Sequence, residues 1–87
     1  MNKEEIGEEV SKFINTNFLF DRKNVDINES LVGSGTIDST GILEVITFLE
    51  KRFNVTFEDE ELVGDNFDTV DRIRSFLFKK LSSNENS

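Results

Sequence analysis

The stretch GTIDSTGILEVI, Gly35 to Ile46, decides how the middle of the chain folds. Asp38 is followed by Ser39 and then by apolar residues at the spacing of an amphipathic helix. Aspartate is a favoured N-cap, so a helix that begins at Ser39 explains the segment without any chemistry. The alternative is functional, because a hydroxyl on the first turn lies beside unpaired backbone N–H groups. These groups and the helix dipole would stabilise a phosphate attached there.

The helical period continues to Phe53, so we predict a helix over 39–53. Its core face would carry Ile42, Val45, Ile46, Leu49 and Phe53. The opposite, solvent-facing stripe would carry Thr40, Glu44, Thr47 and Lys51.

Two further segments have a helical period. In residues 3–19 the apolar face is Ile6, Val10, Phe13, Ile14 and Phe18. In residues 68–81 it is Val70, Ile73, Phe76, Leu77 and Leu81. We predict Asp68 as the N-cap of this last helix, with Lys79 and Lys80 favourably placed at the negative end of its dipole.

The connections between these helices also carry apolar residues, so we expect them to pack. Residues 20–37 retain Val25, Ile27, Leu31, Val32 and Ile37. Residues 54–67 retain Val55, Phe57, Leu62, Val63 and Phe67, with a helical turn predicted in EDEEL. No segment has the period of a strand, so the predicted fold class is all-α, with three main helices and a short one.

Composition excludes several kinds of chemistry. The 87 residues are 36% hydrophobic and 32% charged, as in one small soluble globular domain. Cys and His are both absent, which removes disulfides, thiol nucleophiles, the usual zinc ligands and the commonest general base. Without an in-chain base, Ser39 would have to receive a group from another enzyme rather than act as a nucleophile itself.

The formal charge of −8 predicts the kind of partner. Such a chain repels nucleic-acid phosphates and anionic lipid and attracts basic protein surfaces. No apolar run approaches the ~20 residues that span a bilayer, and the N-terminus MNKEEIGEEV does not resemble a signal peptide. We therefore expect a cytoplasmic monomer that binds protein partners, with no nucleic acid and no membrane insertion.

From Gly35 to Leu62 the chain resembles the 4′-phosphopantetheine attachment region of acyl and peptidyl carrier proteins. The helix order agrees over roughly residues 4–81. The matching motifs are Asp38-Ser39-Thr40, Leu43-Glu44 and Leu49-Glu50-Lys51-Arg52-Phe53, followed by the acidic segment NVTFEDEEL.

The resemblance implies a four-helix carrier-protein bundle over 1–82, with a long first loop and a flexible C-terminal tail over 83–87. It also implies a non-catalytic carrier. A phosphopantetheinyl transferase would use Mg²⁺ and coenzyme A to attach 4′-phosphopantetheine to Ser39, beside Asp38, and the thiol of the arm would carry an acyl or aminoacyl group as a thioester. The other partners would be an acyl- or aminoacyl-activating ligase and a downstream acyltransferase or synthase. Fatty acid, polyketide, amino acid and D-alanine all remain open as cargo.

The partner face departs from the family pattern at three positions. Thr40 replaces the usual leucine after the serine, Thr47 replaces an exposed hydrophobic residue, and Lys51 replaces an acid. The predicted partner-binding residues are Thr40, Leu43, Glu44, Thr47, Phe48 and Lys51. For Leu43 and Phe48 two roles stay open, as apolar docking contacts or as cover for the edge of the core.

Two other functions compete with the carrier. One is an unmodified acidic helical adaptor that binds a basic partner through the helix 39–53, with Ser39 as part of the cap. The other is an enzyme that pairs Glu44 with Asp38 or Glu50, although helix geometry makes these residues resemble a solvated acidic face.

Overall fold

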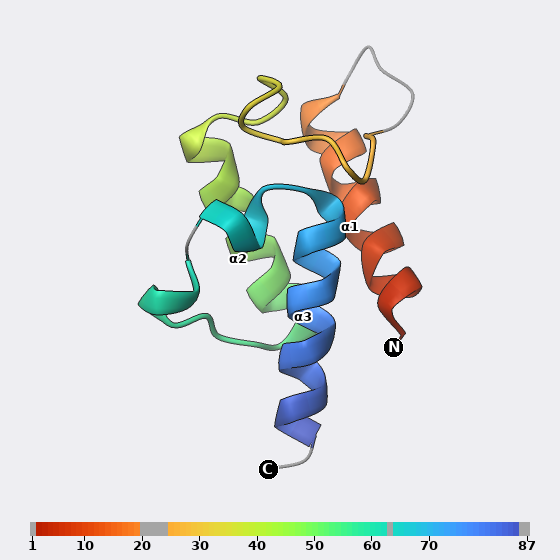
Figure 1. Cartoon of the computed structure of the whole chain (residues 1–87), viewed down its shortest axis with the longest axis vertical. Coiled ribbons are helices and arrows are strands. Elements are labelled where there is room, and N and C mark those ends of the chain that lie inside the picture. The colour runs from red at the N-terminus through yellow and green to blue at the C-terminus, as the bar shows by residue number, and fades with distance from the viewer. Residues whose placement is uncertain (1, 20–24, 63, 86–87) are drawn as a thin grey trace.

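Three α-helices make up most of the fold (Figure 1). The computed structural model describes residues 2–19, 25–62 and 64–85. The helices are α1 (Lys3–Phe18), α2 (Ser39–Phe53) and α3 (Val70–Glu85), with two 3-10 helices, η1 (Asp59–Glu61) and η2 (Gly64–Phe67), between α2 and α3. The described residues contain no strand. The predicted all-α class is confirmed, and the turn predicted in EDEEL is η1.

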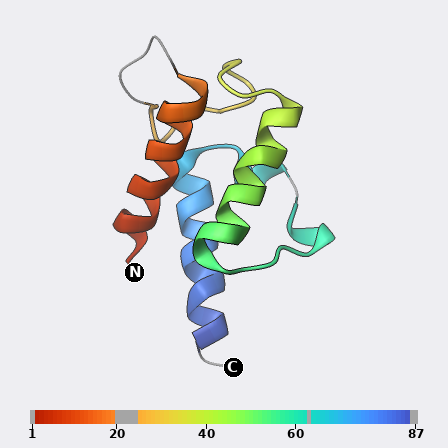
Figure 2. The same cartoon turned by 180° about the vertical axis from the view of Figure 1, so that it is seen from behind.

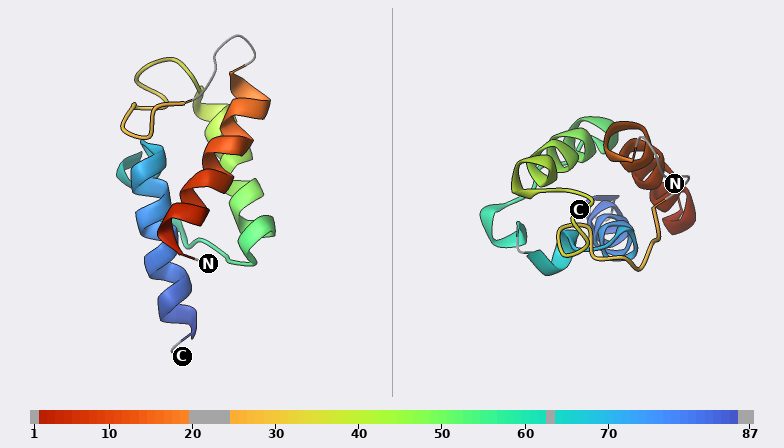
Figure 3. Two further views of the ribbon diagram at one scale, coloured as in Figure 1. Left: turned by 90° about the vertical axis from the view of Figure 1, so that its right-hand side faces the viewer. Right: turned by 90° about the horizontal axis from the view of Figure 1, so that it is seen from above.

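The helices form a bundle in which α1 runs opposite to α2 and α3 (Figures 1 and 2). The closest packing is between α1 and α3, while α2 shares a smaller contact with α1. Seen from above, the three helices surround a common centre, and the long connection crosses one end of the bundle (Figure 3). The last turns of α3 extend beyond the other two helices (Figure 1).

One apolar core lies between the helices. It contains Ile6, Val10 and Ile14 of α1, Val45, Ile46 and Leu49 of α2, and Val70, Ile73 and Leu77 of α3. The connections add Val25, Leu31, Ile37, Val55, Phe57 and Phe67, as predicted.

Two of the apolar residues expected to pack in the connections are instead exposed. Val32, in a turn of the long connection, is 47% exposed, and Leu62, directly after η1, is 40% exposed. Ile27 is half-buried against the core, and Val63 lies outside the described residues. The exposure of Val32 matters for the site described below.

Local hydrogen bonds fix where the first two helices begin and end. At the start of α1, Asn2 and Glu5 form a capping box. At the end of α2, Asn54 adopts the left-handed conformation with φ 55° and donates its backbone N–H to the carbonyl of Glu50. Asparagine tolerates this conformation better than most residues, so α2 stops at the predicted residue.

The start of α3 differs from the prediction. Thr69, not Asp68, caps the helix, because the Thr69 hydroxyl accepts a hydrogen bond of 3.0 Å from the backbone N–H of Arg72. Asp68 bonds instead to a distant loop. The helix also continues through Glu85, so Lys79 and Lys80 lie before its last turn and do not cap it. Lys80 pairs with Glu61 of η1 at 2.8 Å.

Candidate functional site

Ser39 is the first residue of α2, and Asp38 is its N-cap. The Asp38 carboxylate accepts a hydrogen bond of 2.7 Å from the backbone N–H of Gly41, which satisfies one of the unpaired donors at the helix start. The predicted cap is therefore confirmed. A cofactor-binding role for Asp38 stays a prediction.

The Ser39 side chain is exposed. Among residues 2–19, 25–62 and 64–85, none makes a hydrogen bond with its hydroxyl. The first turn of α2 contains no acidic residue, so no side chain within that turn supplies negative charge to its unpaired N–H groups. The hydroxyl is thus accessible, beside a helix end that favours a negative group.

Gly41 allows the first turn of α2 to lie close to its neighbours. A Cβ atom at this position would come within 2.6 Å of Ile37 Cγ2 and 3.0 Å of Phe18 Cε1. No side chain larger than hydrogen fits without movement, so Gly41 sets the position of the turn that carries Ser39. A glycine inside a helical pattern is the sequence signal that could have indicated such a close approach.

A groove of about 460 Å³ opens beside Ser39. Its other lining residues are Val32 from the long connection, Ile42 from α2, and Gly64, Asp65, Phe67 and Asp68 from η2 and its end. Three segments that are distant in sequence therefore build it, which explains why periodicity did not predict it.

The floor of the groove is firmly packed. Phe67 is 3% exposed, and its ring makes an edge contact with Phe57 at 5.4 Å and with Phe76 at 5.9 Å. Edge-to-face contacts of this kind add to the stability from burial. Lys80 lies 5.7 Å from the centroid of the Phe57 ring and pairs with Glu61, so Phe57, which packs on Phe67, and η1 are both held to α3.

The predicted partner stripe is exposed along its whole length: Thr40, Glu44, Thr47 and Lys51 all face solvent. Phe48 and Leu43, whose roles the sequence left open, differ in how far they are buried. Phe48 is half-buried and stacks on Phe13 at 4.1 Å, so it covers the edge of the core. Leu43 is 61% exposed, which leaves it accessible to a partner.

The acidic residues considered for catalysis have separate structural tasks. Asp38 caps α2, and the Glu50 carboxylate accepts a hydrogen bond of 3.1 Å from the backbone N–H of Phe57. In the described part of the chain no group of Asp and Glu residues could hold a metal ion. Asp38 and Glu50, the two residues considered as partners of Glu44, therefore each accept a structural hydrogen bond from the backbone.

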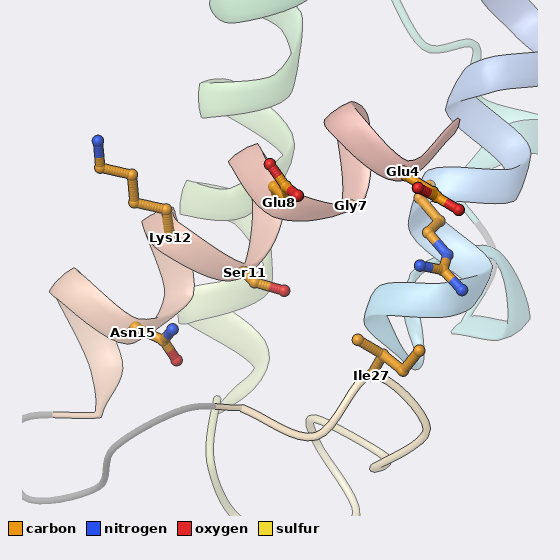
Figure 4. A pocket seen from close by; sticks show the side chains of 8 residues that line it. Glu4, Gly7, Glu8, Ser11, Lys12, Asn15 and Ile27 are labelled. Carbon is orange, nitrogen blue, oxygen red and sulfur yellow. The ribbon is translucent and has the colours of Figure 1, made fainter. Parts of the chain in front are cut away.

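A larger groove of about 600 Å³ lies on α1, away from Ser39 (Figure 4). It is lined by Glu4, Gly7, Glu8, Ser11, Lys12, Asn15, Ile27 and Arg74. The Arg74 guanidinium makes two hydrogen bonds to Asp71, at 3.0 Å and 2.8 Å. Charges of both signs surround this groove, and Glu4 and Glu8 bring negative charge to it, so it lacks the features that mark Ser39.

None of the described helices is both long enough and apolar enough to cross a membrane.

Comparison with known proteins identifies the family. No protein-family model matches the chain. The chain is 33% identical over 69 residues to the D-alanyl carrier protein of Streptococcus mutans serotype c, an alignment that covers 79% of this chain and 86% of that protein. It is 37% identical over 49 residues to the D-alanyl carrier protein of Streptococcus suis, covering 56% and 62% of the two chains. The resemblance seen in the sequence is thereby confirmed: the protein is a non-catalytic carrier and belongs to the acyl carrier protein family.

Proposed function

We propose that this carrier holds an acyl or aminoacyl group as a thioester on a 4′-phosphopantetheine arm attached to Ser39. The observation that supports this most directly is the exposed, unpaired hydroxyl of Ser39 at the start of α2. The chain has no cysteine, so the arm would supply the thiol that forms the thioester. The relatives are named D-alanyl carrier proteins, which favours D-alanine as the cargo. The same names favour a modified carrier over an unmodified adaptor.

The residues around Ser39 fit such an arm. Its phosphate would lie at the N-terminal end of α2, where backbone N–H groups and the helix dipole favour a negative charge. Val32, Ile42 and Phe67 give the adjacent groove apolar surface for the methylene and methyl groups of the arm. Asp65 lines the same groove, and its carboxylate can accept a hydrogen bond from an amide N–H group of the arm.

The proposed partners act one after another on the same face. A phosphopantetheinyl transferase attaches the arm, an aminoacyl- or acyl-activating ligase loads it, and an acyltransferase or synthase removes the cargo. Each must reach Ser39, so each would contact the exposed stripe that continues from it along α2. Tethering the cargo raises its effective concentration at every partner. The cytoplasmic location expected from the sequence is part of this proposal.

Intact mass spectrometry tests the proposal. The protein is incubated with coenzyme A, Mg²⁺ and a broad-specificity phosphopantetheinyl transferase. Wild type should gain the mass of one arm, and Ser39→Ala should gain none while keeping its helical circular dichroism. Ser11→Ala, in the groove on α1, is the matched control and should be modified like wild type. Modification that persists in Ser39→Ala, or its absence in wild type, would refute the proposal.

A further inference from the structure

Asp68 connects two parts of the chain that are distant in sequence. Its carboxylate accepts a hydrogen bond of 2.6 Å from the Ser30 hydroxyl, a partly buried contact. Its backbone carbonyl accepts a second bond of 2.7 Å from the N–H of Leu31. Asp68, which directly follows η2, is thus bonded twice to the long connection that leads into α2.

These two bonds continue toward Ser39. The Ser30 hydroxyl also accepts a bond of 3.0 Å from the N–H of Gly33, so it orders the turn that carries Val32. The carbonyl of Leu31, which is fully buried, accepts a bond of 3.0 Å from the N–H of Ile37. Ile37 is buried and directly precedes Asp38, the cap of α2. Asp68 therefore binds the loop directly at Ser30 and Leu31, and it supports the end of the loop indirectly, through the bond between Leu31 and Ile37.

The same contact joins two sides of the groove beside Ser39. Val32 lines the groove from the loop, and Asp68 lines it from the start of the α3 region. A hydrogen bond to an ionised acceptor is among the stronger ones in proteins. The Ser30–Asp68 bond consequently holds the Val32 side and the Asp68 side of the groove at a fixed separation next to Ser39.

We propose that Asp68 is a positioning residue for the modification of Ser39, acting through Ser30 and the loop that leads into α2. This inference rests on the function proposed above. Asp68 lies outside the stripe of α2 that would bind the transferase, so it affects how the Ser39 hydroxyl is presented rather than how tightly the carrier docks.

Steady-state kinetics of arm attachment separate presentation from docking. Asp68→Ala and Ser30→Ala should each lower kcat about five- to tenfold with KM for the carrier little changed, since a small misplacement of a reacting group slows the chemical step. Asp68→Asn keeps an oxygen that can accept the Ser30 hydrogen bond and should restore most of the rate. The double variant should be no slower than either single variant, because both remove the same bond.

Amide hydrogen exchange gives a readout that needs no transferase. In the unmodified protein, Asp68→Ala should speed exchange of the Leu31 and Ile37 amides about tenfold, because the loop opens more easily. The matched control is Asp71→Ala, whose carboxylate pairs with Arg74 on α3 and makes no side-chain bond to residues 25–37, the described part of the loop. It should leave both the exchange and kcat as in wild type.

The outcomes distinguish the two proposals. If wild-type Ser39 gains no arm, the proposed function fails and Asp68 loses its role with it. If wild type is modified but Asp68→Ala has the wild-type kcat, or raises KM alone, the positioning role is overturned while the carrier function stands. Equal rates for Asp68→Asn and Asp68→Ala, or unchanged exchange at Ile37, would also overturn it.

Discussion

The Asp38 carboxylate lies 2.7 Å from the backbone nitrogen of Gly41, so the residue next to Ser39 binds its own helix. The two residues together place the serine: Asp38 fixes where α2 begins, and Gly41 fixes how closely its first turn approaches Phe18 and Ile37. Local backbone geometry therefore contributes to the presentation of Ser39, and this contribution can be tested by changes that leave the serine intact.

Replacing Asp38 with alanine should lower the free energy of unfolding by about 1 kcal/mol, because the Gly41 N–H loses its partner. For a domain of this size the Tm should fall by about 4–8 °C, measured by thermal circular dichroism. Asp38→Asn retains a capping oxygen and should stay close to wild type. A wild-type Tm in Asp38→Ala would contradict the assignment of the cap.

Gly41→Ala should destabilise the fold even though alanine favours helices. The gain in helix propensity is about 1 kcal/mol. The added Cβ would lie 2.6 Å from Ile37 Cγ2, and overpacking of this kind typically costs about 1–3 kcal/mol. We expect a net loss of about 1 kcal/mol in chemical denaturation and slower modification of Ser39.

Gly64→Ala is the matched control for this change, since a Cβ there would meet no atom within 4 Å. It should alter stability by no more than about 0.5 kcal/mol. If Gly41→Ala is as stable as wild type, the close approach of α2 does not limit the fold.

The ion pair between Glu61 and Lys80 should make stability depend on pH. The backbone N–H of Glu58 and then the Lys80 ammonium hold the pKa of Glu61 below its ordinary value of 4.5. A carboxyl group whose pKa is lower in the folded than in the unfolded protein stabilises the fold at pH values above its unfolded pKa. That stabilisation is lost as the pH falls through its folded pKa. Glu61→Gln should therefore be less stable than wild type by about 1 kcal/mol at neutral pH.

The difference in Tm between wild type and Glu61→Gln should shrink as pH is lowered below 4.5. Glu60→Gln, at the exposed neighbouring position, should match wild type throughout the titration. A gap between Glu61→Gln and wild type that stays constant down to acid pH would show that the carboxylate charge is not responsible.

Leu43 and Glu44 should contribute to docking in different ways. Glu44→Lys should slow association with the transferase at low salt, and the effect should weaken as salt screens the charge. Leu43→Ala should raise KM about tenfold at all salt concentrations, because burial of a leucine at an interface does not depend on ionic strength. Both residues are exposed, so circular dichroism should remain unchanged.

Thr56→Ala is a matched control outside the stripe, because Thr56 is exposed on the connection that follows α2. Its kinetics should resemble those of wild type. If Leu43→Ala and Glu44→Lys both show wild-type kinetics at low salt, the partners approach Ser39 from another face.

The sequence was sufficient wherever structure depends on near neighbours. The bounds of α2 follow from the Asp38 cap and the helical period, and its exposed stripe follows from the same period. The buried residues of the connections could be predicted in part, since Val25, Leu31 and Ile37 are apolar among polar neighbours. The family resemblance added the prediction that Ser39 is the attachment site, because no local pattern distinguishes this serine from an ordinary helix start.

What could not be predicted depends on contacts between distant segments. Asp68 and Thr69 are both good caps, and the choice of Thr69 follows from the bond that Asp68 makes to Ser30, 38 residues away. In the same way Lys80 bonds to Glu61 rather than to the end of its own helix. The groove beside Ser39 depends on three such segments and has no linear signature.

The close packing of α1 on α3 also bears on how the protein is made. These two helices are separated by the whole of α2 and its connections, so their pairing closes a long loop of chain. During synthesis a nascent chain that has exposed only α1 and α2 lacks the apolar surface of Val70, Ile73 and Leu77 that completes the core. The core is therefore complete only when α3 is available, and a chain that stops before α3 lacks the helix against which α1 packs.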